Sequence, residues 1–232
     1  MTPGPSRSPA PETRDRILDA AEGLFVEHGF EATSMRMITS SAGANIAAVN
    51  YHFGTKDALI QEVFGRRLTE LNRQRLAALD RLQAEAKGEP LKPSRIVEAF
   101  FGTALELAAD TEHGGHTFMR LLGRTYTEPN AFVRKFMAEE YAEVLERFLG
   151  ALYSALPDVP REEILWRFHF MMGAMSYAIA GTDSLQLFAG SFDDADPQRL
   201  MPRLMSFLLG GLRAPLAEFA QGAVQGGDRE AA

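Results

Sequence analysis

Apolar positions recur every three or four residues along most of this chain, and alternating patterns typical of strands are scarce. This spacing is typical of helices that bury one face. The first such stripe lies between Thr13 and Gly29, where glycine favours a break in the helix. We therefore expect an all-α protein built from amphipathic helices.

Residues 33–56, TSMRMITSSAGANIAAVNYHFGTK, have the pattern of two short helices joined by a tight turn at Gly43. We expect Thr33 to cap the first helix and Asn45 to cap the second, because both side chains accept hydrogen bonds from free backbone N–H groups. The expected buried stripes contain Met35, Ile38 and Ala42, then Ile46, Val49 and Phe53. Two such helices form a helix-turn-helix.

A long helix is expected to begin after Thr55 and to continue past Leu82, until the segment KGEPLKP (87–93) breaks the pattern. We expect its outer face to be solvated. The basic residues of that face are Arg66, Arg67, Arg73 and Arg75. Beyond the break, prolines separate further expected helices near 94–109, 115–127, 130–155, 160–182 and 197–218.

Composition excludes several classes of function. The chain has 232 residues, a formal net charge of -7 and no cysteine, which excludes thiolate catalysis and cysteine-ligated zinc. The Pro- and Ser-rich start lacks the apolar core of a signal peptide, and the strongest apolar run, near 170–180, is too short to cross a bilayer. We expect a cytoplasmic protein without a membrane partner.

The segment 33–56 contains no acidic residue although the protein as a whole is acidic. The outer face of its second helix carries Ala47, Ala48, Asn50 and Tyr51, which are small or uncharged. Such a face suits entry into a DNA major groove, where carboxylates would be repelled by phosphates.

Residues 13–64 resemble the N-terminal domain of TetR-family transcriptional regulators, through ILDAAEGLFVEHGFEATSMRMI and AGANIAAVNYHFGTKDALI. The resemblance implies a homodimeric, usually repressing protein that binds a double-stranded DNA operator and needs no cofactor or metal. It implies a three-helix head joined by a long helix to a helical ligand-binding and dimerisation domain. The expected segments are a disordered lead (1–12), a DNA-binding domain (13–57), an effector-binding and dimerisation domain (58–219) and a disordered tail (220–232).

The same resemblance implies roles by position. Phosphate contacts are expected from Thr33, Arg36, Tyr51, His52 and Lys56, the last at a helix N-terminus that favours anions. Base contacts are expected from Asn45, Ala47, Ala48 and Asn50. Asn45 has a capping role as its alternative, and His52 an alternative as a simple helix end. Ala48 and Asn50 replace the family's usual Thr and frequent aromatic residue, so the operator sequence does not transfer.

The C-terminal half is rich in large apolar residues, which form either an ordinary helical core or an apolar tunnel for a ligand. The candidates for a ligand site are Phe101, Leu105, Phe118, Leu121, Leu122, Tyr126, Tyr141, Phe168, Met171, Met172 and Met175. Segments such as FMRLLGRTYTEP and LWRFHFMMGAMSYAIAG resemble PsrA-type regulators. That branch implies a fatty acid or acyl-CoA effector and repression of fatty-acid degradation genes.

For dimerisation we favour the last two long helices, whose alternative role is packing within the protomer. Their candidate interface residues are Ala174, Tyr177, Ala178, Leu200, Leu204, Phe207 and Leu208. Other functions remain open: a sensor of drugs or other apolar molecules, an activator, or a helical-bundle metalloenzyme using the cluster Glu112, His113 and His116.

Overall fold

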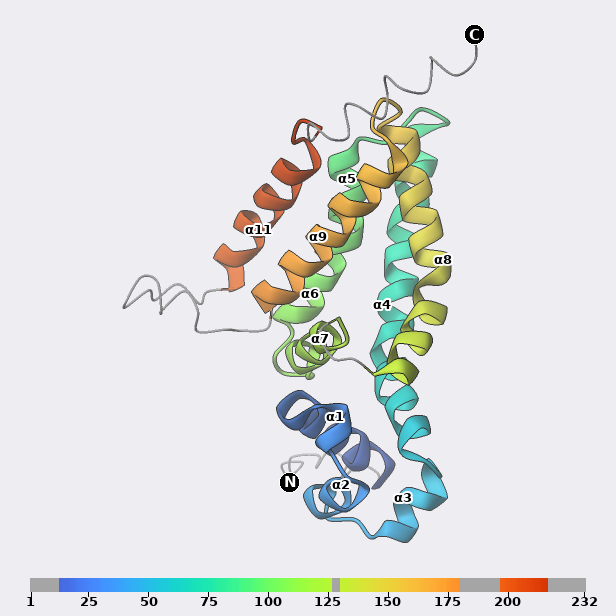
Figure 1. Cartoon of the computed structure of the whole chain (residues 1–232), viewed down its shortest axis with the longest axis vertical. Coiled ribbons are helices and arrows are strands. Elements are labelled where there is room, and N and C mark those ends of the chain that lie inside the picture. The colour runs from blue at the N-terminus through green and yellow to red at the C-terminus, as the bar shows by residue number, and fades with distance from the viewer. Residues whose placement is uncertain (1–12, 127–129, 180–196, 217–232) are drawn as a thin grey trace, which may run out of the picture.

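The computed structural model describes residues 13–126, 130–179 and 197–216, and these residues contain helices and no strand. The expected all-α fold is confirmed. A small head at one end, formed by the first three helices, is joined by one long helix to a larger body (Figure 1). The helices are α1 (Thr13–Ala32), α2 (Met35–Ala42), α3 (Ile46–His52), α4 (Lys56–Ala86), α5 (Pro93–Val97), the π-helical segment η1 (Glu98–Gly102), α6 (Thr103–Ala109), α7 (Gly115–Arg124), α8 (Ala131–Ala155), α9 (Arg161–Ile179) and α11 (Pro197–Leu212).

The head is held together by apolar side chains and by local caps. Gly29, with a φ of 84°, interrupts the helical backbone of α1, and Gly43, with a φ of 58°, ends α2 in the left-handed conformation. Asn45 caps α3 as expected, since its side chain accepts from the backbone N–H of Ala48 at 2.8 Å. Phe25, Phe30 and Phe64 then pack their rings within the head core and against α4.

The expected cap at Thr33 is wrong. Ser34 caps α2 instead, by accepting from the backbone N–H of Met37. Thr33 is fully buried, and its hydroxyl donates to the carbonyl of Gly29 at 2.7 Å and to that of Leu24 at 3.1 Å. Thr33 therefore fastens α2 to the end of α1.

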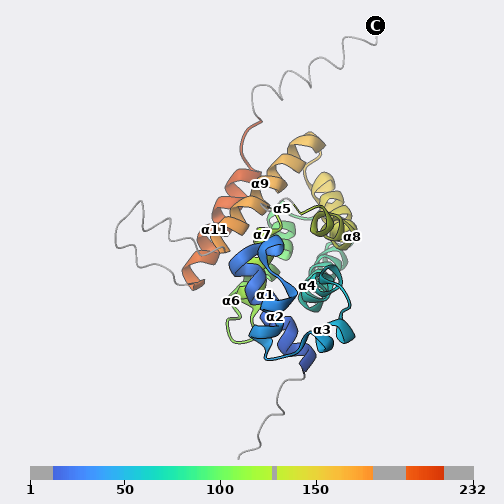
Figure 2. The same ribbon diagram turned by 60° about the horizontal axis from the view of Figure 1, so that its bottom comes forward.

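Helix α4 connects head and body in one continuous element. Thr55 caps it as expected, accepting from the backbone N–H of Ala58, and the helix runs alongside α8 (Figure 1). Viewed toward the head, α1 and α2 lie beside the first turns of α4 (Figure 2). Movement of α4 against the body would therefore carry the head with it.

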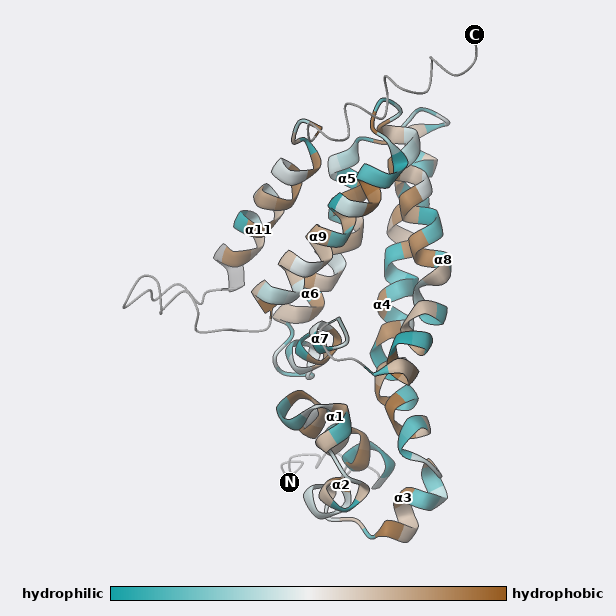
Figure 3. Ribbon diagram, in the orientation of Figure 1, coloured by the Kyte–Doolittle hydropathy of each residue, from teal (hydrophilic) through white to brown (hydrophobic). Residues whose placement is uncertain are grey.

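The body is a helical cluster around aromatic side chains. Phe100 contacts Phe148 and Phe168 with ring centroids 5.1 and 4.9 Å apart, which joins η1, α8 and α9. Brown, apolar positions of these helices turn toward one another, whereas teal positions cover much of the outside (Figure 3). Sequence reasoning placed one helix over 94–109, but the backbone there is divided by the π-helical segment.

Other limits also differ. Helix α7 ends at Arg124 and α11 at Leu212, earlier than the expected ends, while the expected end of the 160–182 helix, the lead and the tail lie outside the described residues. Arg75, expected on a solvated face, is fully buried because η1 and α8 cover that side of α4. No described helix has the length and apolar character that crossing a membrane requires.

Candidate nucleic-acid interface and its connection to the body

Helix α3 is presented at the end of the head, beyond the first turn of α4 (Figure 1). Val49 is fully buried and Phe53 nearly so, and these two side chains fix the helix against the head. Ile46, expected in the same stripe, is 47% exposed, so that part of the expectation is wrong. The buried stripe is short because α3 has only seven residues.

Most of the expected DNA-contacting residues reach the surface of α2 and α3. Tyr51 is 86% exposed and stands beside the ring of His52, with centroids 5.2 Å apart. Ala48 and Lys56 are half-buried, and the Lys56 ammonium donates to the carbonyl of Glu31 at 3.4 Å. The exposed members of the set are Arg36, Asn45, Ala47, Asn50, Tyr51 and His52.

Thr33 does not belong to this surface. Its hydroxyl is buried between α1 and α2 and already donates to two carbonyls. The expectation of a phosphate contact from this side chain is therefore corrected to a packing role. Ser34, which the sequence analysis passed over, is exposed; its oxygen accepts from the Met37 N–H in the cap, which leaves its hydroxyl hydrogen able to donate.

The surface formed by α2 and α3 carries no acidic side chain. The first carboxylate after the α2–α3 segment is Asp57, in the first turn of α4, where a negative side chain complements the helix dipole. The exposed side chains of α3 thus include no carboxylate. A surface of this kind can approach phosphates closely and place small side chains against base edges.

A buried ionic junction links the head to α4. Arg66 of α4 donates to Asp19 at 2.6 Å and to Glu22, both on α1, and Arg67 lies 3.8 Å from Glu22. Burial raises the pKa of the Glu22 carboxyl, and the neighbouring Arg66 and Arg67 act in the opposite direction. Burying such a group is costly unless its partners stay in place, so the junction favours one docking of α1 on α4. Sequence reasoning missed Glu22, because only the fold brings positions 22 and 66 together.

Further contacts tie α1 to the body. Arg67 donates to the carbonyl of His113 in the turn before α7. Arg124 of α7 donates to the carbonyl of Val26 at 2.7 Å, and Asn130 donates to the Glu31 carboxylate at 2.6 Å. The first contact joins α4 to the turn before α7, and the other two join α1 to α7 and to the start of α8. A rearrangement of the body therefore changes the contacts that hold the head in place.

The predicted ligand residues gather in the body but are tightly packed. Phe101, Leu105, Phe118, Leu121, Leu122, Tyr141, Phe168, Met171 and Met175 belong to the buried core, Met172 is half-buried, and Tyr126 is 46% exposed. None of them lines the three surface grooves that lie beside α4–α6–α11, α4–α8 and α5–α9–α11. The choice between core and tunnel therefore stays open, and their ligand role stays a prediction.

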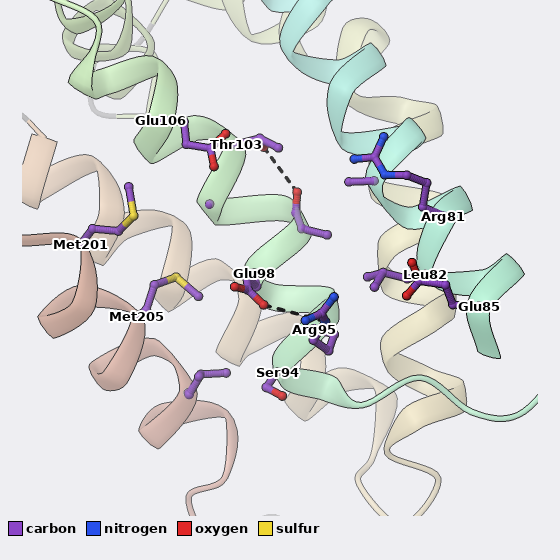
Figure 4. A pocket seen from close by; sticks show the side chains of 14 residues that line it. Arg81, Leu82, Glu85, Ser94, Arg95, Glu98, Thr103, Glu106, Met201 and Met205 are labelled. Carbon is purple, nitrogen blue, oxygen red and sulfur yellow. Dashed lines mark hydrogen bonds and ion pairs between the residues drawn. The ribbon is translucent and has the colours of Figure 1, made fainter. Parts of the chain in front are cut away.

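One described cavity is a groove of about 480 Å³ between α4, α5–η1–α6 and α11. Figure 4 shows Met201 and Met205 on one wall, Arg81, Leu82 and Glu85 on the other, and Thr103 between them. Glu98 and Glu106 also line the groove, and Glu98 is 3.9 Å from Arg95. The groove thus combines apolar side chains with carboxylates.

Helices α9 and α11 pack on each other and leave an apolar outer face. Phe170 is 64% and Phe207 68% exposed, and Trp166 stacks on Phe170 with centroids 5.7 Å apart. Tyr177 is also exposed, whereas Ala174, Ala178 and Leu200 are half-buried. Leu204 and Leu208 are buried within the protomer, which corrects their predicted place in a dimer interface.

The metalloenzyme alternative finds no site in the described part of the chain. His113 contacts Asp110 at 3.0 Å in an exposed turn, and no cluster of three or more His, Asp or Glu side chains arranged for a metal ion occurs among the described residues.

Comparison with known proteins agrees with this architecture. The family model described as "Bacterial regulatory proteins, tetR family" matches residues 17–63, and the model described as "Tetracyclin repressor-like, C-terminal domain" matches residues 98–211. The HTH-type transcriptional repressor BepR of Brucella suis is 30% identical over 148 residues, which cover 63% of this chain and 68% of that protein.

Two solved structures have a similar fold at low sequence identity. The fatty acid degradation regulator FadR from Bacillus halodurans aligns with a TM-score of 0.55 and 15% identity, over 90% of this chain and 100% of that chain. The ketosteroid transcriptional regulator KstR2 of Mycobacterium tuberculosis aligns with a TM-score of 0.59 and 16% identity, over 87% of this chain and 95% of that chain. These likenesses extend the fold over both head and body.

Proposed function

Since the chain belongs to the tetR family of bacterial regulatory proteins, and is thus a DNA-binding transcriptional regulator rather than an enzyme, we propose that it is a homodimeric repressor released from its operator by a long-chain fatty acid or acyl derivative. The observation that carries the proposal is the continuity of α4. This helix begins directly after its cap Thr55, close to the end of α3, and its buried face between Leu68 and Leu79 lies in the body, so it joins the DNA-facing end to the apolar core.

The apolar core supports an acyl effector. Phe, Leu and Met side chains from η1, α6, α7 and α9 converge there, and methionine in particular adapts its shape to a flexible guest. Burying a methylene contributes about 0.8 kcal/mol, so a long chain can offset the loss of side-chain packing that its entry requires. Two neighbours of similar fold are named as a fatty acid degradation regulator and a ketosteroid transcriptional regulator, and both names refer to largely apolar compounds.

The outer face of α9 and α11 supports a homodimer. Trp166, Phe170 and Phe207 together expose an aromatic surface of a kind that monomeric proteins rarely leave open. A twofold pairing of this face would place two copies of α3 on the same side of the assembly. Two such helices can enter successive major grooves about 34–36 Å apart along the DNA.

Release from the operator is then a shift between two states of the dimer. The effector must bind better to the state in which the two heads no longer fit successive grooves, and the extent of release is limited by that difference in affinity. The junction of Glu22 with Arg66 and the contact of Arg124 with Val26 are the described links that would transmit the change.

The test is an operator-binding titration. An operator duplex is first selected from random DNA with the purified protein, and its affinity is measured by fluorescence anisotropy with increasing oleate. The proposal expects tight binding without oleate and release as oleate is added. Unchanged operator affinity for every acyl chain length tried, or a strictly monomeric protein, would refute it.

A sensor of cationic apolar molecules is the second candidate, and the groove of Figure 4 is what favours it. Methionines and Leu82 line that groove together with Glu85, Glu98 and Glu106, and although Arg81 and Arg95 also line it, the carboxylates outnumber the arginines, a combination that suits an apolar cation. Release of the operator by a lipophilic amine, with no response to oleate, would select this function instead.

A further inference from the structure

Arg75 is a fully buried cation in the middle of the body. It projects from α4 into the region between η1 and α8. Among the described residues no carboxylate lies within ion-pair distance of its guanidinium. The other buried arginine, Arg167, pairs with Glu163 at 2.8 Å, so the missing counter-charge is particular to Arg75.

The guanidinium makes only neutral contacts. Its Nε donates to the carbonyl of Phe100 at 3.0 Å, and its Nη1 lies 3.3 Å from the Asn72 amide oxygen and 3.5 Å from the Tyr141 hydroxyl. The group also lies over the Phe100 ring, 4.0 Å from its centroid. Its Nη2 is buried and has no hydrogen-bond partner within residues 13–126, 130–179 and 197–216.

Burying Arg75 in this way lowers the stability of the folded protein when no ligand is bound. A buried charge is tolerated when an opposite charge and a full set of hydrogen bonds surround it, and a buried donor without an acceptor adds a further cost. Carbonyls and an aromatic face offset part of the cost, but they supply no negative charge. An anion that accepts a bond from Nη2 would supply both missing elements.

Tyr126 connects this interior site with the surface. Burial of its hydroxyl raises the pKa of Tyr126 well above the ordinary value, with Tyr141 adding to the rise and the nearby Arg75 opposing it. The residue as a whole is nevertheless 46% exposed, so its exposed surface lies away from the hydroxyl. A rotation of this one side chain would open a route from solvent to Tyr141 and Arg75.

We propose that Arg75 binds the carboxylate of the effector, with its Nη2 as the principal donor and the hydroxyls of Tyr126 and Tyr141 as further donors. The inference rests on the acyl effector proposed above and identifies its head-group site. The ligand class is therefore a monoanionic amphiphile, and an uncharged chain of the same length is a poor effector.

The site is also placed to act on the head. Arg75 belongs to α4, so an anion that draws the guanidinium away from the Phe100 carbonyl pulls on the helix that carries α3. The Phe100 carbonyl would keep the hydroxyl of Thr103, which donates to it at 3.0 Å. The π-helical turn that holds Phe100 would then be released from α4, which couples head-group binding to the fold of η1.

The experiment compares oleate with oleyl alcohol by calorimetric titration, below the concentration at which oleate forms micelles. The unmodified protein is expected to bind oleate roughly tenfold to hundredfold more tightly, the range for hydrogen bonds to a charged group. Arg75→Met, which keeps an apolar side chain of similar length, is expected to bind both compounds equally. Arg73→Met, two residues away on the exposed face of α4, should keep the preference.

Each possible result leads to a different conclusion about the effector and its head-group site. If the alcohol binds and releases the operator as well as oleate does, the acyl response stands and the Arg75 site is refuted. If Arg81→Met, in the groove of Figure 4, removes the preference instead, the head group binds there and the inference is wrong. Absence of binding by both compounds overturns the acyl effector and this site together. If Arg75→Met does not fold, equal binding of oleate and oleyl alcohol by the unmodified chain still refutes the site, and a preference for oleate that Arg81→Met keeps still supports it.

Discussion

Replacing Thr33 by valine separates a packing role from a DNA-contacting role. The Thr33 side chain is fully buried, and its hydroxyl donates to the carbonyls of Gly29 and Leu24. Valine has nearly the same shape, so the change removes the hydroxyl while leaving the packed volume almost intact. The perturbation is therefore confined to the two hydrogen bonds.

The expected loss follows from those bonds. The Thr33 hydroxyl has one hydrogen, which the two carbonyls share, so its removal costs about one intramolecular hydrogen bond and lowers the free energy of unfolding by about 0.5–1.5 kcal/mol. For a protein of this size each kcal/mol corresponds to roughly 2–4 °C in the melting temperature. Thr33→Val should thus melt a few degrees earlier than the unmodified protein.

The assay is thermal unfolding followed by circular dichroism, with operator affinity measured well below the transition. Thr69→Val is the matched control, because Thr69 is exposed on α4 and makes no described side-chain hydrogen bond. The control should melt within about 0.5 kcal/mol of the unmodified protein, as surface changes usually do. A Thr33→Val variant with unchanged melting but weakened operator binding would refute the packing role and restore the phosphate contact.

Three further changes test the head, the α6–α7 turn and the dimer face. Tyr51→Phe should leave unfolding unchanged and weaken operator binding roughly two- to tenfold, by the loss of one phosphate hydrogen bond; equal affinity in a gel-shift titration would remove Tyr51 from the interface. Gly115→Ala should destabilise the fold by about 1–3 kcal/mol or more, because its Cβ would lie 2.1 Å from the Leu107 carbonyl oxygen. Gly65→Ala on α4 meets nothing within 4 Å and should be neutral or stabilising in the same melting experiment. Phe170→Glu should convert dimers to monomers in sedimentation velocity, since the Phe170 side chain is exposed on the proposed interface; an unchanged dimer would place the contact elsewhere.

Much of the head could be predicted from sequence because its signals are local. Asn45 and Thr55 each precede a helix by one residue, and their caps depend only on a backbone N–H group three positions away. The choice between Thr33 and Ser34 as the cap of α2 is not local. It depends on the carbonyls of Leu24 and Gly29, which α1 brings to Thr33 through the bend at Gly29.

The body was harder to predict because helical periodicity does not say which neighbour covers a face. Arg66, Arg73 and Arg75 lie on one helix, yet Arg73 is exposed, Arg66 is partly buried and Arg75 is fully buried, since η1 and α8 cover α4 at that point. Leu204 and Leu208 form an apolar stripe that suits either a partner copy or α9. In the structure α11 packs on α9, Leu204 and Leu208 are buried within the protomer, and Phe207 is exposed.

The central claim is that a ligand bound in the body changes the distance between the two heads of a dimer, so that they no longer match successive major grooves. The chain has no cysteine, so Ser41→Cys on the exposed side of α2 accepts one spin label per protomer without a background label. Pulsed dipolar spectroscopy then measures the distance between the two heads directly. The account predicts one distance distribution in the operator complex and a displaced one when oleate is bound. Identical distributions in the two states, with oleate binding confirmed in the same sample, would contradict it.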